Sequence, residues 1–273
     1  MPEGDSIFRA ARTLNRALAG SEVTRFESVF PALTRIDHDR PLAGRTIKSV
    51  SSRGKHILMA FSGDLQLRTH MKMSGSWHLY RPGERWQRPA GDMRIVIETA
   101  RFVAVGFKVP SAEFLSGRDV ASHKKLGALG PDLLSPDFDR NEALRRMREQ
   151  GSAAIADVLL NQRVVAGVGN IFKSEVLFLT GVDPFAPASG LSDDTLCRIV
   201  DEARKQLQAN VLRQSQTLST ASGIRTTRSL DPREKLWVYD RGGKPCRKCG
   251  TTIRSKKTGD DARGTWWCPE CQT

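Results

Sequence analysis

The chain has 273 residues, and 43 Lys and Arg against 30 Asp and Glu give it a formal net charge of +13 at pH 7. Hydrophobic residues form 39% of it, enough for packed cores, while no apolar run approaches the ~18 residues that a membrane-spanning helix needs. We therefore expect two or three folded units, a polyanionic partner and no membrane partner; the absence of a secretory signal predicts a cytoplasmic protein.

The first part of the chain predicts one helix followed by many short strands. Apolar side chains spaced as on one helix face run from Ile7 to Leu18, and Gly20 can end that helix. From about Val23 to Phe107 the apolar period changes to two, and clusters of Gly, Pro, Asp and Ser separate the segments. This pattern is typical of an antiparallel β-sandwich or barrel capped by the first helix.

The second half of the chain has helical periodicity. Four helices are predicted, of which the third begins at Asn170 and the fourth is capped by Ser192. The polar stretch at 213–234 is interpreted as a linker or a mobile loop.

These patterns predict an α+β fold in three domains. We expect an antiparallel β-sandwich with flanking helices at 1–125, a helical domain with its following loop at 126–235, and a small module at 236–273. The last module is more basic than the chain as a whole.

Four of the five cysteines lie in the last 28 residues, as two Cys-x2-Cys pairs. Two such pairs can close a tetrahedron of thiolates around zinc and leave no open position for catalysis. A module this short has too little core to fold alone, so we predict one structural Zn²⁺ held by Cys246, Cys249, Cys268 and Cys271.

Basic residues stand between the two cysteine pairs: Arg254, Lys256, Lys257 and Arg263, followed by two tryptophans. We interpret this stretch as a two-stranded hairpin whose tip presents cations to phosphates. A solvated basic turn over a small aromatic core remains an alternative.

Three further stretches carry weaker signals. The Gly-Val-Gly-Asn turn at 167–170 opens a helix, where glycines allow close approach and unpaired N–H groups attract anions, but such turns also serve packing alone. The Arg-Gly-Lys stretch at 53–55 precedes a strand, where cations are commonly just exposed. His70 and Met73 could be ordinary loop residues, with Met73 filling a gap in the core.

The chain starts Met1-Pro2-Glu3-Gly4. A small second residue allows removal of the initiator methionine, which would expose the secondary amine of Pro2. Such an amine titrates near ~8, can attack carbon and can form an iminium directly, with Glu3 beside it as a proton carrier. Alone, however, a proline at position two is common and uninformative.

Together, Pro2-Glu3-Gly4, Arg53-Gly54-Lys55, the glycine turn before Asn170, and the cysteine module with Arg263 five residues before Cys268 resemble one family. It comprises the bacterial DNA glycosylase/lyases of the formamidopyrimidine-DNA glycosylase and endonuclease VIII type, and the resemblance covers the whole chain. It implies a two-layer β-sandwich, a helix–two-turn–helix domain and a zinc finger. The implied protein is a nucleoid-associated monomer that acts on damaged double-stranded DNA in base excision repair.

The resemblance also implies roles for individual residues. Pro2 would attack C1′ of the damaged nucleotide and form a Schiff base, while Glu3 would protonate the sugar ring oxygen. Lys55 would contact phosphate and assist β-elimination, and Arg263 would assist δ-elimination. The implied DNA contacts are Asn170, which would hold a phosphate at the kink, Met73, which would fill the void left by the flipped base, and His70, Lys72 and Arg254.

Departures from the family pattern concern recognition of the lesion. The oxidised-purine branch usually carries an Asp-Pro-Arg-Arg-Phe-Gly loop, but residues 105–110 read Val-Gly-Phe-Lys-Val-Pro. Asp5 and the Trp266-Trp267 pair look more like endonuclease VIII, although that branch often has Gln-Leu-Tyr where this chain has Lys72-Met73-Ser74. A damage-contacting Arg of some members falls near Ala128. We therefore expect oxidised pyrimidines to be favoured.

An enzyme that has kept only the lyase activity on abasic sites cannot be separated from this interpretation by sequence, and two further alternatives remain open at this point. One is an oxidised-purine (formamidopyrimidine or 8-oxoguanine) glycosylase. The other is a non-enzymatic zinc-ribbon binder of nucleic acid, which would have no use for a free Pro2 beside Glu3.

Overall fold

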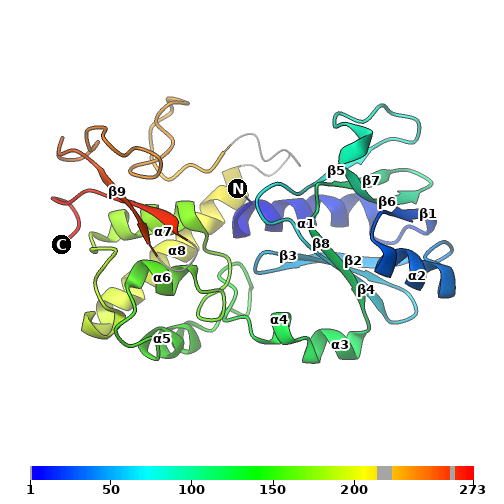
Figure 1. The fold of residues 1–273 in the computed structure, drawn as a ribbon, viewed down its shortest axis with the longest axis horizontal. Coiled ribbons are helices and arrows are strands. Elements are labelled where there is room, and N and C mark those ends of the chain that lie inside the picture. The colour runs from blue at the N-terminus through cyan, green and yellow to red at the C-terminus, as the bar shows by residue number, and fades with distance from the viewer. Residues whose placement is uncertain (1, 214–222, 259–261) are drawn as a thin grey trace. The chain divides into compact units, whose positions relative to one another are not determined.

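The computed structural model describes residues 2–213, 223–258 and 262–273, and its chain divides into two compact units (Figure 1). Unit 1 comprises the described residues up to Ala128, and unit 2 comprises those from Leu129 onward. In these parts of the chain, no helix is long and apolar enough to cross a membrane.

Unit 1 is built mainly from strands. Its elements are α1 (Gly4–Leu18), β1 (Val23–Ser28), α2 (Pro31–Asp39), β2 (Ile47–Arg53), β3 (His56–Phe61), β4 (Leu65–His70), β5 (Ser76–Tyr80), η1 (Ala90–Asp92), β6 (Met93–Thr99), β7 (Val103–Phe107), β8 (Ser111–Leu115), α3 (Gly117–Ser122) and α4 (Lys124–Gly127). The described strands of unit 1 form two antiparallel four-stranded sheets, ordered β1-β6-β7-β5 and β2-β3-β4-β8.

One hydrophobic core joins the two sheets. Met59 and Leu67 from one sheet and Ile95 and Ile97 from the other pack with Leu14 of α1, and all five are buried. Because period-two strands place alternate side chains on one face, this packing follows from the pattern, and the predicted sandwich with its flanking helix is confirmed.

Helix α2 is a correction to the predicted run of strands. Pro31 occupies its first turn, where the missing N–H is tolerated, and Leu33 is its one fully buried side chain among the described residues. A helix with so few apolar positions shows little helical periodicity. The period-two pattern of the strands on either side therefore hid it from the sequence analysis. Helices α3 and α4 were also not predicted.

Unit 2 is mainly helical. Its elements are α5 (Arg140–Arg148), α6 (Ile155–Leu160), α7 (Asn170–Thr180), η2 (Ala188–Gly190), α8 (Asp193–Arg213), β9 (Arg254–Thr258) and β10 (Arg263–Trp267). The four predicted helices are present. Helix α7 begins at Asn170, and Ser192 caps α8, where its Oγ accepts from the Thr195 backbone N–H at 3.2 Å.

The polar stretch after α8 is a second correction. Residues 214–222 lie outside the described residues, but 223–234 are not a loose linker. Asn210, buried in α8, accepts a hydrogen bond from the Arg225 N–H and donates one to the Arg225 carbonyl, both at 2.9 Å. Ile224, Thr226 and Thr227 are buried as well. Amino-acid composition does not distinguish a threonine that is buried and hydrogen-bonded from a threonine in an exposed linker.

The hairpin β9–β10 packs against α7 within unit 2. Its register runs from Thr258 opposite Arg263 to Arg254 opposite Trp267. Val238, Ile253, Cys246 and Cys268 form a small buried cluster with Phe178 of α7. The small core of the module is thus completed by a helix of the preceding region.

Candidate functional site

Two polar segments leave one end of the sheet β2-β3-β4-β8. In the strand register Arg53 of β2 lies opposite His56 of β3, and His56 lies opposite His70 of β4, so the three residues are neighbours across the sheet. The Gly54-Lys55 turn and the loop at 71–75 therefore project from the same end of the sheet. Lys55 is half-buried in this tight turn, which Gly54 permits with a φ of 57°.

Helix α1 is directed toward that same end. It runs antiparallel to β2, since the Gly20 N–H donates to the Ile47 carbonyl at 2.8 Å and the Val50 N–H donates to Asn15 Oδ1 at 2.7 Å. From Asn15 back to Glu3 the helix extends about 18 Å, more than the roughly 10 Å that β2 covers from Val50 to its end. The start of the chain thus reaches the end of the sheet that carries Lys55.

Glu3 caps α1 and is fully buried. Its backbone N–H donates to Ser6 Oγ at 2.9 Å, and its carbonyl accepts from the Ile7 N–H at 3.0 Å. The positive end of the helix favours a carboxylate here. Pro2 beside it is half-buried, and Met1, whose removal the prediction requires, lies outside the described residues.

A buried charge pair lies in the first turns of the same helix. Asp5 Oδ2 is 3.6 Å from Arg9 Nη2, and the side chains are 0% and 5% exposed. Burial raises the pKa of Asp5 above its ordinary value, and the positive charge of Arg9 opposes this effect. The pair thus places two desolvated ionisable groups close to Pro2 and Glu3 in sequence.

The loop at 71–75 presents Met73 to solvent. Lys72 has a φ of 44°, and its N–H donates to His70 Nδ1 at 3.1 Å. A Cβ on Gly75 would lie 2.8 Å from the Met71 carbonyl oxygen, so the tight loop requires glycine there. The Met73 side chain is 68% exposed, which excludes the alternative that it fills a gap in the core.

Sequence reasoning missed two further residues near this end of the sheet, Arg68 and His56. Arg68 is buried in β4, where it hydrogen-bonds His56 Nδ1 at 2.8 Å and forms an ion pair with Glu113. The ring of His56 contacts that of His70, with centroids 4.6 Å apart. The available signal was a lone arginine within the otherwise strand-like segment 65–69.

Asn170 lies in unit 2, at the first position of α7, and is 7% exposed. Gly167 adopts a φ of 110°, and Gln162 holds the turn by accepting from the Gly167 N–H at 3.1 Å and donating to the Val168 carbonyl at 2.9 Å. Among the described residues, Asn170 Oδ1 is buried with no hydrogen-bond partner. Since an amide can turn its NH₂ into the same place, the turn offers donors for a phosphate.

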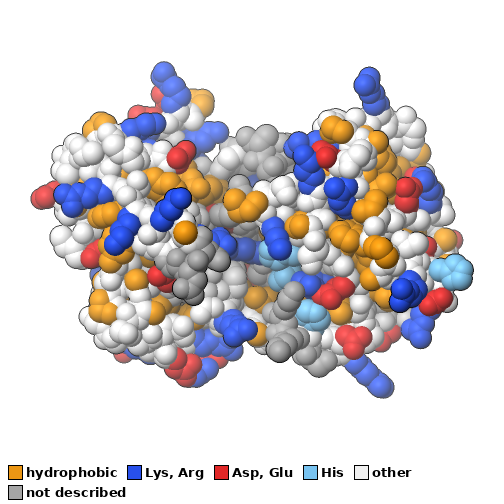
Figure 2. Space-filling view, in the orientation of Figure 1, with side chains coloured by type: hydrophobic (Ala, Val, Ile, Leu, Met, Phe, Trp, Pro, Cys, Tyr) orange, Lys and Arg blue, Asp and Glu red, His pale blue; other side chains and the backbone are white. Residues whose placement is uncertain are grey.

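The hairpin carries the predicted cations. Arg254, Lys256 and Lys257 are exposed on β9, and Arg263, half-buried, is the first residue of β10; residues 259–261 lie outside the described residues. Trp266 packs on Tyr239 and Trp267 on Phe185, with ring centroids 4.5 and 4.8 Å apart. The hairpin thus has both an aromatic support and a row of cationic side chains, of which Lys256 Nζ lies 5.8 Å from the centroid of the Phe185 ring. Figure 2 shows Lys and Arg side chains spread over both units on the face drawn.

The four cysteines of the module form a metal site. The Sγ atoms of Cys246, Cys249, Cys268 and Cys271 all lie within 4.8 Å of one another. A zinc–sulfur distance of about 2.3 Å puts thiolates about 3.8 Å apart in a tetrahedron, so the cluster fits one Zn²⁺ with no position left for substrate. The zinc is therefore structural, as predicted.

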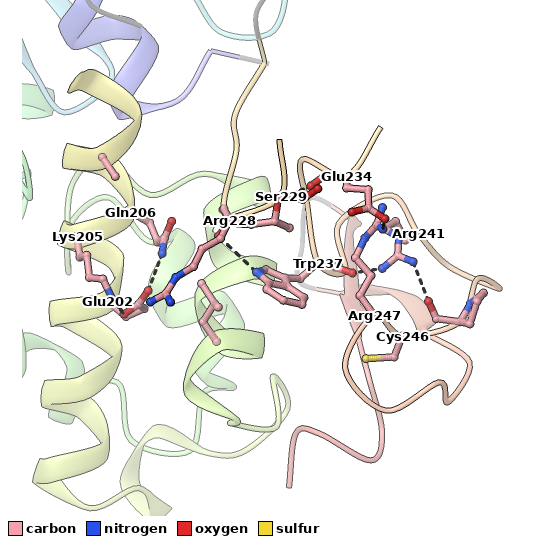
Figure 3. A pocket seen from close by; sticks show the side chains of 15 residues that line it. Glu202, Lys205, Gln206, Arg228, Ser229, Glu234, Trp237, Arg241, Cys246 and Arg247 are labelled. Atoms are coloured by element: carbon pink, nitrogen blue, oxygen red, sulfur yellow. Dashed lines mark hydrogen bonds and ion pairs between the residues drawn. The ribbon is translucent and has the colours of Figure 1, made fainter. Parts of the chain in front are cut away.

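A separate cavity of about 870 Å³ lies in unit 2, between α8 and the segment 226–247 (Figure 3). Three of its cations have polar partners: Arg241 donates to the carbonyls of Trp237 and Pro245, Arg247 pairs with Glu234 at 2.6 Å, and Lys205 pairs with Glu202 at 3.0 Å. None of the predicted catalytic residues lines it.

Comparisons with known proteins cover both units. Models of the formamidopyrimidine-DNA glycosylase N-terminal domain, the formamidopyrimidine-DNA glycosylase H2TH domain and the zinc finger found in FPG and IleRS match residues 1–110, 129–222 and 243–273. The whole chain is 40% identical to a probable endonuclease 8 2 of Streptomyces coelicolor, of which it covers 94%. It is also 37% identical to the DNA-(apurinic or apyrimidinic site) lyase Nei2 of Mycolicibacterium smegmatis, of which it covers 99%. The fold matches that of Lactococcus lactis Fpg in complex with DNA containing an abasic site, with a TM-score of 0.83, 26% identity and full coverage of both chains.

Proposed function

This chain belongs to the formamidopyrimidine-DNA glycosylase and endonuclease VIII family, and from that premise we propose which of its residues carry the reaction. It is a bifunctional DNA glycosylase and AP lyase of base excision repair, on the endonuclease VIII side of the family, and its partner is damaged DNA. The non-enzymatic alternative is therefore set aside. We further propose that it works as a monomer in the cytoplasm, associated with the nucleoid, and that its domains are 1–125, 126–235 and 236–273.

The catalytic residues that we propose in unit 1 are Pro2, Glu3 and Lys55. The observation that carries the proposal is that α1 directs its N-terminus toward the end of the sheet where Lys55 and the 71–75 loop project. The nitrogen of Pro2 forms a bond to C1′ and loses its proton to Glu3, while the bond from C1′ to the base breaks with its electron pair leaving on the base, which takes up a proton from water. Glu3 gives a proton to the ring oxygen as the sugar opens to the Schiff base.

Strand cleavage follows from the Schiff base. Loss of a proton from C2′ expels the 3′ phosphate, and a second elimination expels the 5′ phosphate. Lys55 supports the first step by holding phosphate, and Arg263 supports the second. Both cations stabilise negative charge on a departing phosphate, which is a general contribution of Lys and Arg in such reactions.

DNA is held by residues of both units. In unit 1 we assign phosphate contacts to His70 and Lys72, and a gap-filling role to Met73, whose exposed apolar side chain suits a plug for the space left by a flipped base. In unit 2 we assign phosphate contacts to Asn170 and Arg254. The amide oxygen of Asn170, which is buried and has no hydrogen-bond partner within the described part of the chain, and the exposed charge of Arg254 support these assignments.

Oxidised pyrimidines are the proposed substrates. The Asp-Pro-Arg-Arg-Phe-Gly loop of the oxidised-purine branch is absent, and the relatives named above are endonuclease 8 and AP lyase proteins. Excision rates on duplexes containing thymine glycol, dihydrouracil or 8-oxoguanine test this. Fastest excision of 8-oxoguanine opposite cytosine would assign the chain to the oxidised-purine branch instead.

Covalent trapping tests the catalytic assignment. Borohydride should link the enzyme to abasic DNA through its N-terminal residue, and Pro2→Gly should weaken the trapping. Glu3→Gln should slow base excision by about 10²- to 10⁴-fold while cleavage of a preformed abasic site falls less. Pro82→Gly, which changes an exposed proline of a turn, is the control and should behave as the parent. An adduct that maps to an internal lysine would overturn the role of Pro2.

A further inference from the structure

Lys173 is a fully buried lysine on α7, and its ammonium points to the hairpin. Its Nζ donates to the Gly264 carbonyl at 3.0 Å and to Thr265 Oγ1 at 2.8 Å. Both partners lie about 90 residues away in sequence, in β10. Removing a lysine charge from water is costly, so a lysine in this position indicates a contact with a specific purpose.

The part of the hairpin that Lys173 contacts directly follows Arg263. Thr265 is fully buried, and its Oγ1 also lies 2.8 Å from Thr258 Oγ1 on β9, the residue that pairs with Arg263. A Cβ on Gly264 would lie 2.5 Å from the ring of Trp266, so this residue cannot carry a side chain without moving the tryptophan. Lys173 therefore fixes the base of the segment that presents Arg263.

The same helix begins at Asn170. Lys173 is three residues later, about 4.5 Å along the helix axis, or just under one turn. Helix α7 thus offers a proposed phosphate contact at its first residue, and it holds the hairpin of Arg263 one turn further on. Both features belong to unit 2.

We propose that Lys173 is a positioning residue for δ-elimination: its ammonium holds Arg263 in a fixed position relative to the DNA phosphate that Asn170 contacts. Lys173 does not touch the DNA in this proposal. It acts through the backbone of Gly264 and the hydroxyl of Thr265. The proposal rests on the proposed function, because it assumes that Arg263 serves the second elimination.

The test is single-turnover cleavage of a duplex with a preformed abasic site, in which β- and δ-products are resolved. Lys173→Met removes the ammonium but keeps most of the side-chain volume. It should lower the δ-elimination rate about ten- to hundredfold, as expected for a catalytic group displaced by about 1 Å, while β-elimination and borohydride trapping keep the parent rates. Lys205→Met removes one exposed charge from α8 and should match the parent in every readout.

A purely structural role for Lys173 predicts different results. It would lower zinc content, β-elimination and δ-elimination together. A double variant separates the cases further: if Lys173 acts through Arg263, adding Lys173→Met to Arg263→Ala leaves the δ-elimination rate of the single Arg263 variant unchanged. The proposal would be overturned if the δ-elimination rate of the double variant fell by the product of the two single-variant factors.

A second variant covers the case in which Lys173→Met loses zinc. Thr265→Val keeps the lysine and the zinc ligands and removes one of the two acceptors, so it should lower the δ-elimination rate by a smaller factor at one zinc per chain. A δ-elimination rate in Thr265→Val equal to that of the parent protein would overturn the positioning role of Lys173. If Arg263→Ala itself retains the parent δ-elimination rate, the assignment of Arg263 in the proposed function fails first, and that result is separate from a failure of Lys173 alone.

Discussion

Glu175 offers the sharpest test of how the zinc module is attached to α7. Its carboxylate is fully buried, and four donors converge on it: Oε1 accepts from the N–H groups of Val238 and Tyr239 at 2.8 Å, and Oε2 accepts from the Trp237 N–H at 2.8 Å and from the Thr226 hydroxyl. Burial raises the pKa of Glu175, and these hydrogen bonds oppose the rise. Two segments of unit 2 are thus held by one side chain.

Glu175→Gln replaces one carboxylate oxygen with an NH₂ group of the same size. Whichever way the amide turns, two donors lose their acceptor. Hydrogen bonds to a charged group contribute about 1.5–3 kcal/mol each, and relief of the buried charge offsets part of the loss, so we expect the attachment to weaken by about 2–4 kcal/mol.

Amide hydrogen exchange measures this change directly, because three of the donors are backbone N–H groups. Local opening governs their exchange, so a loss of 2–4 kcal/mol should speed it about thirty- to thousandfold at residues 237–239. Glu149→Gln is the control, since that carboxylate is 56% exposed in its pair with Arg145. Unchanged protection at 237–239 would refute the reasoning, as would an equal loss of protection throughout unit 2.

Other expected outcomes concern the start of α1, the zinc and the exposed loop. Arg9→Met leaves Asp5 buried without its cation and should cost about 3–5 kcal/mol at neutral pH. Since burial raises the pKa of Asp5, the stability that its protonated form contributes is fully present below the ordinary value of 3.8 and is lost as the pH rises through the raised value. The deficit in thermal midpoint should therefore shrink as the pH falls from neutral toward 3.8, and a constant deficit would contradict this. Cys268→Ser should release the zinc and loosen residues 241–273 while unit 1 stays folded, as metal analysis and circular dichroism can show; one retained zinc per chain would contradict it. Met73→Ala should lower excision from duplex DNA about tenfold or more, since burying a methionine is worth about 1.5–3 kcal/mol, with a smaller effect on single strands. Equal losses on both substrates would argue against a plug.

The sequence by itself determined the features that depend on residues close together in the chain. The zinc ligands follow from two Cys-x2-Cys pairs, and the start of α7 follows from the glycine turn before Asn170. The sandwich follows from period-two alternation, since that period alone puts one face of each strand in the core. Each is decided by local spacing, and each was predictable without a fold.

Tertiary structure decided the rest, because the partners lie far apart in sequence. Lys173 and Glu175 look like ordinary polar residues of a helix, and only the fold brings Gly264 to one and residues 237–239 to the other. Thr226 and Thr227 stand in a polar stretch that resembles a linker, but they are buried. Met73 is of a residue type that is common in protein cores, but it is exposed. Most buried polar side chains are stable because hydrogen-bond partners are supplied to them, and for Lys173 and Glu175 those partners come from segments that meet only in the folded chain.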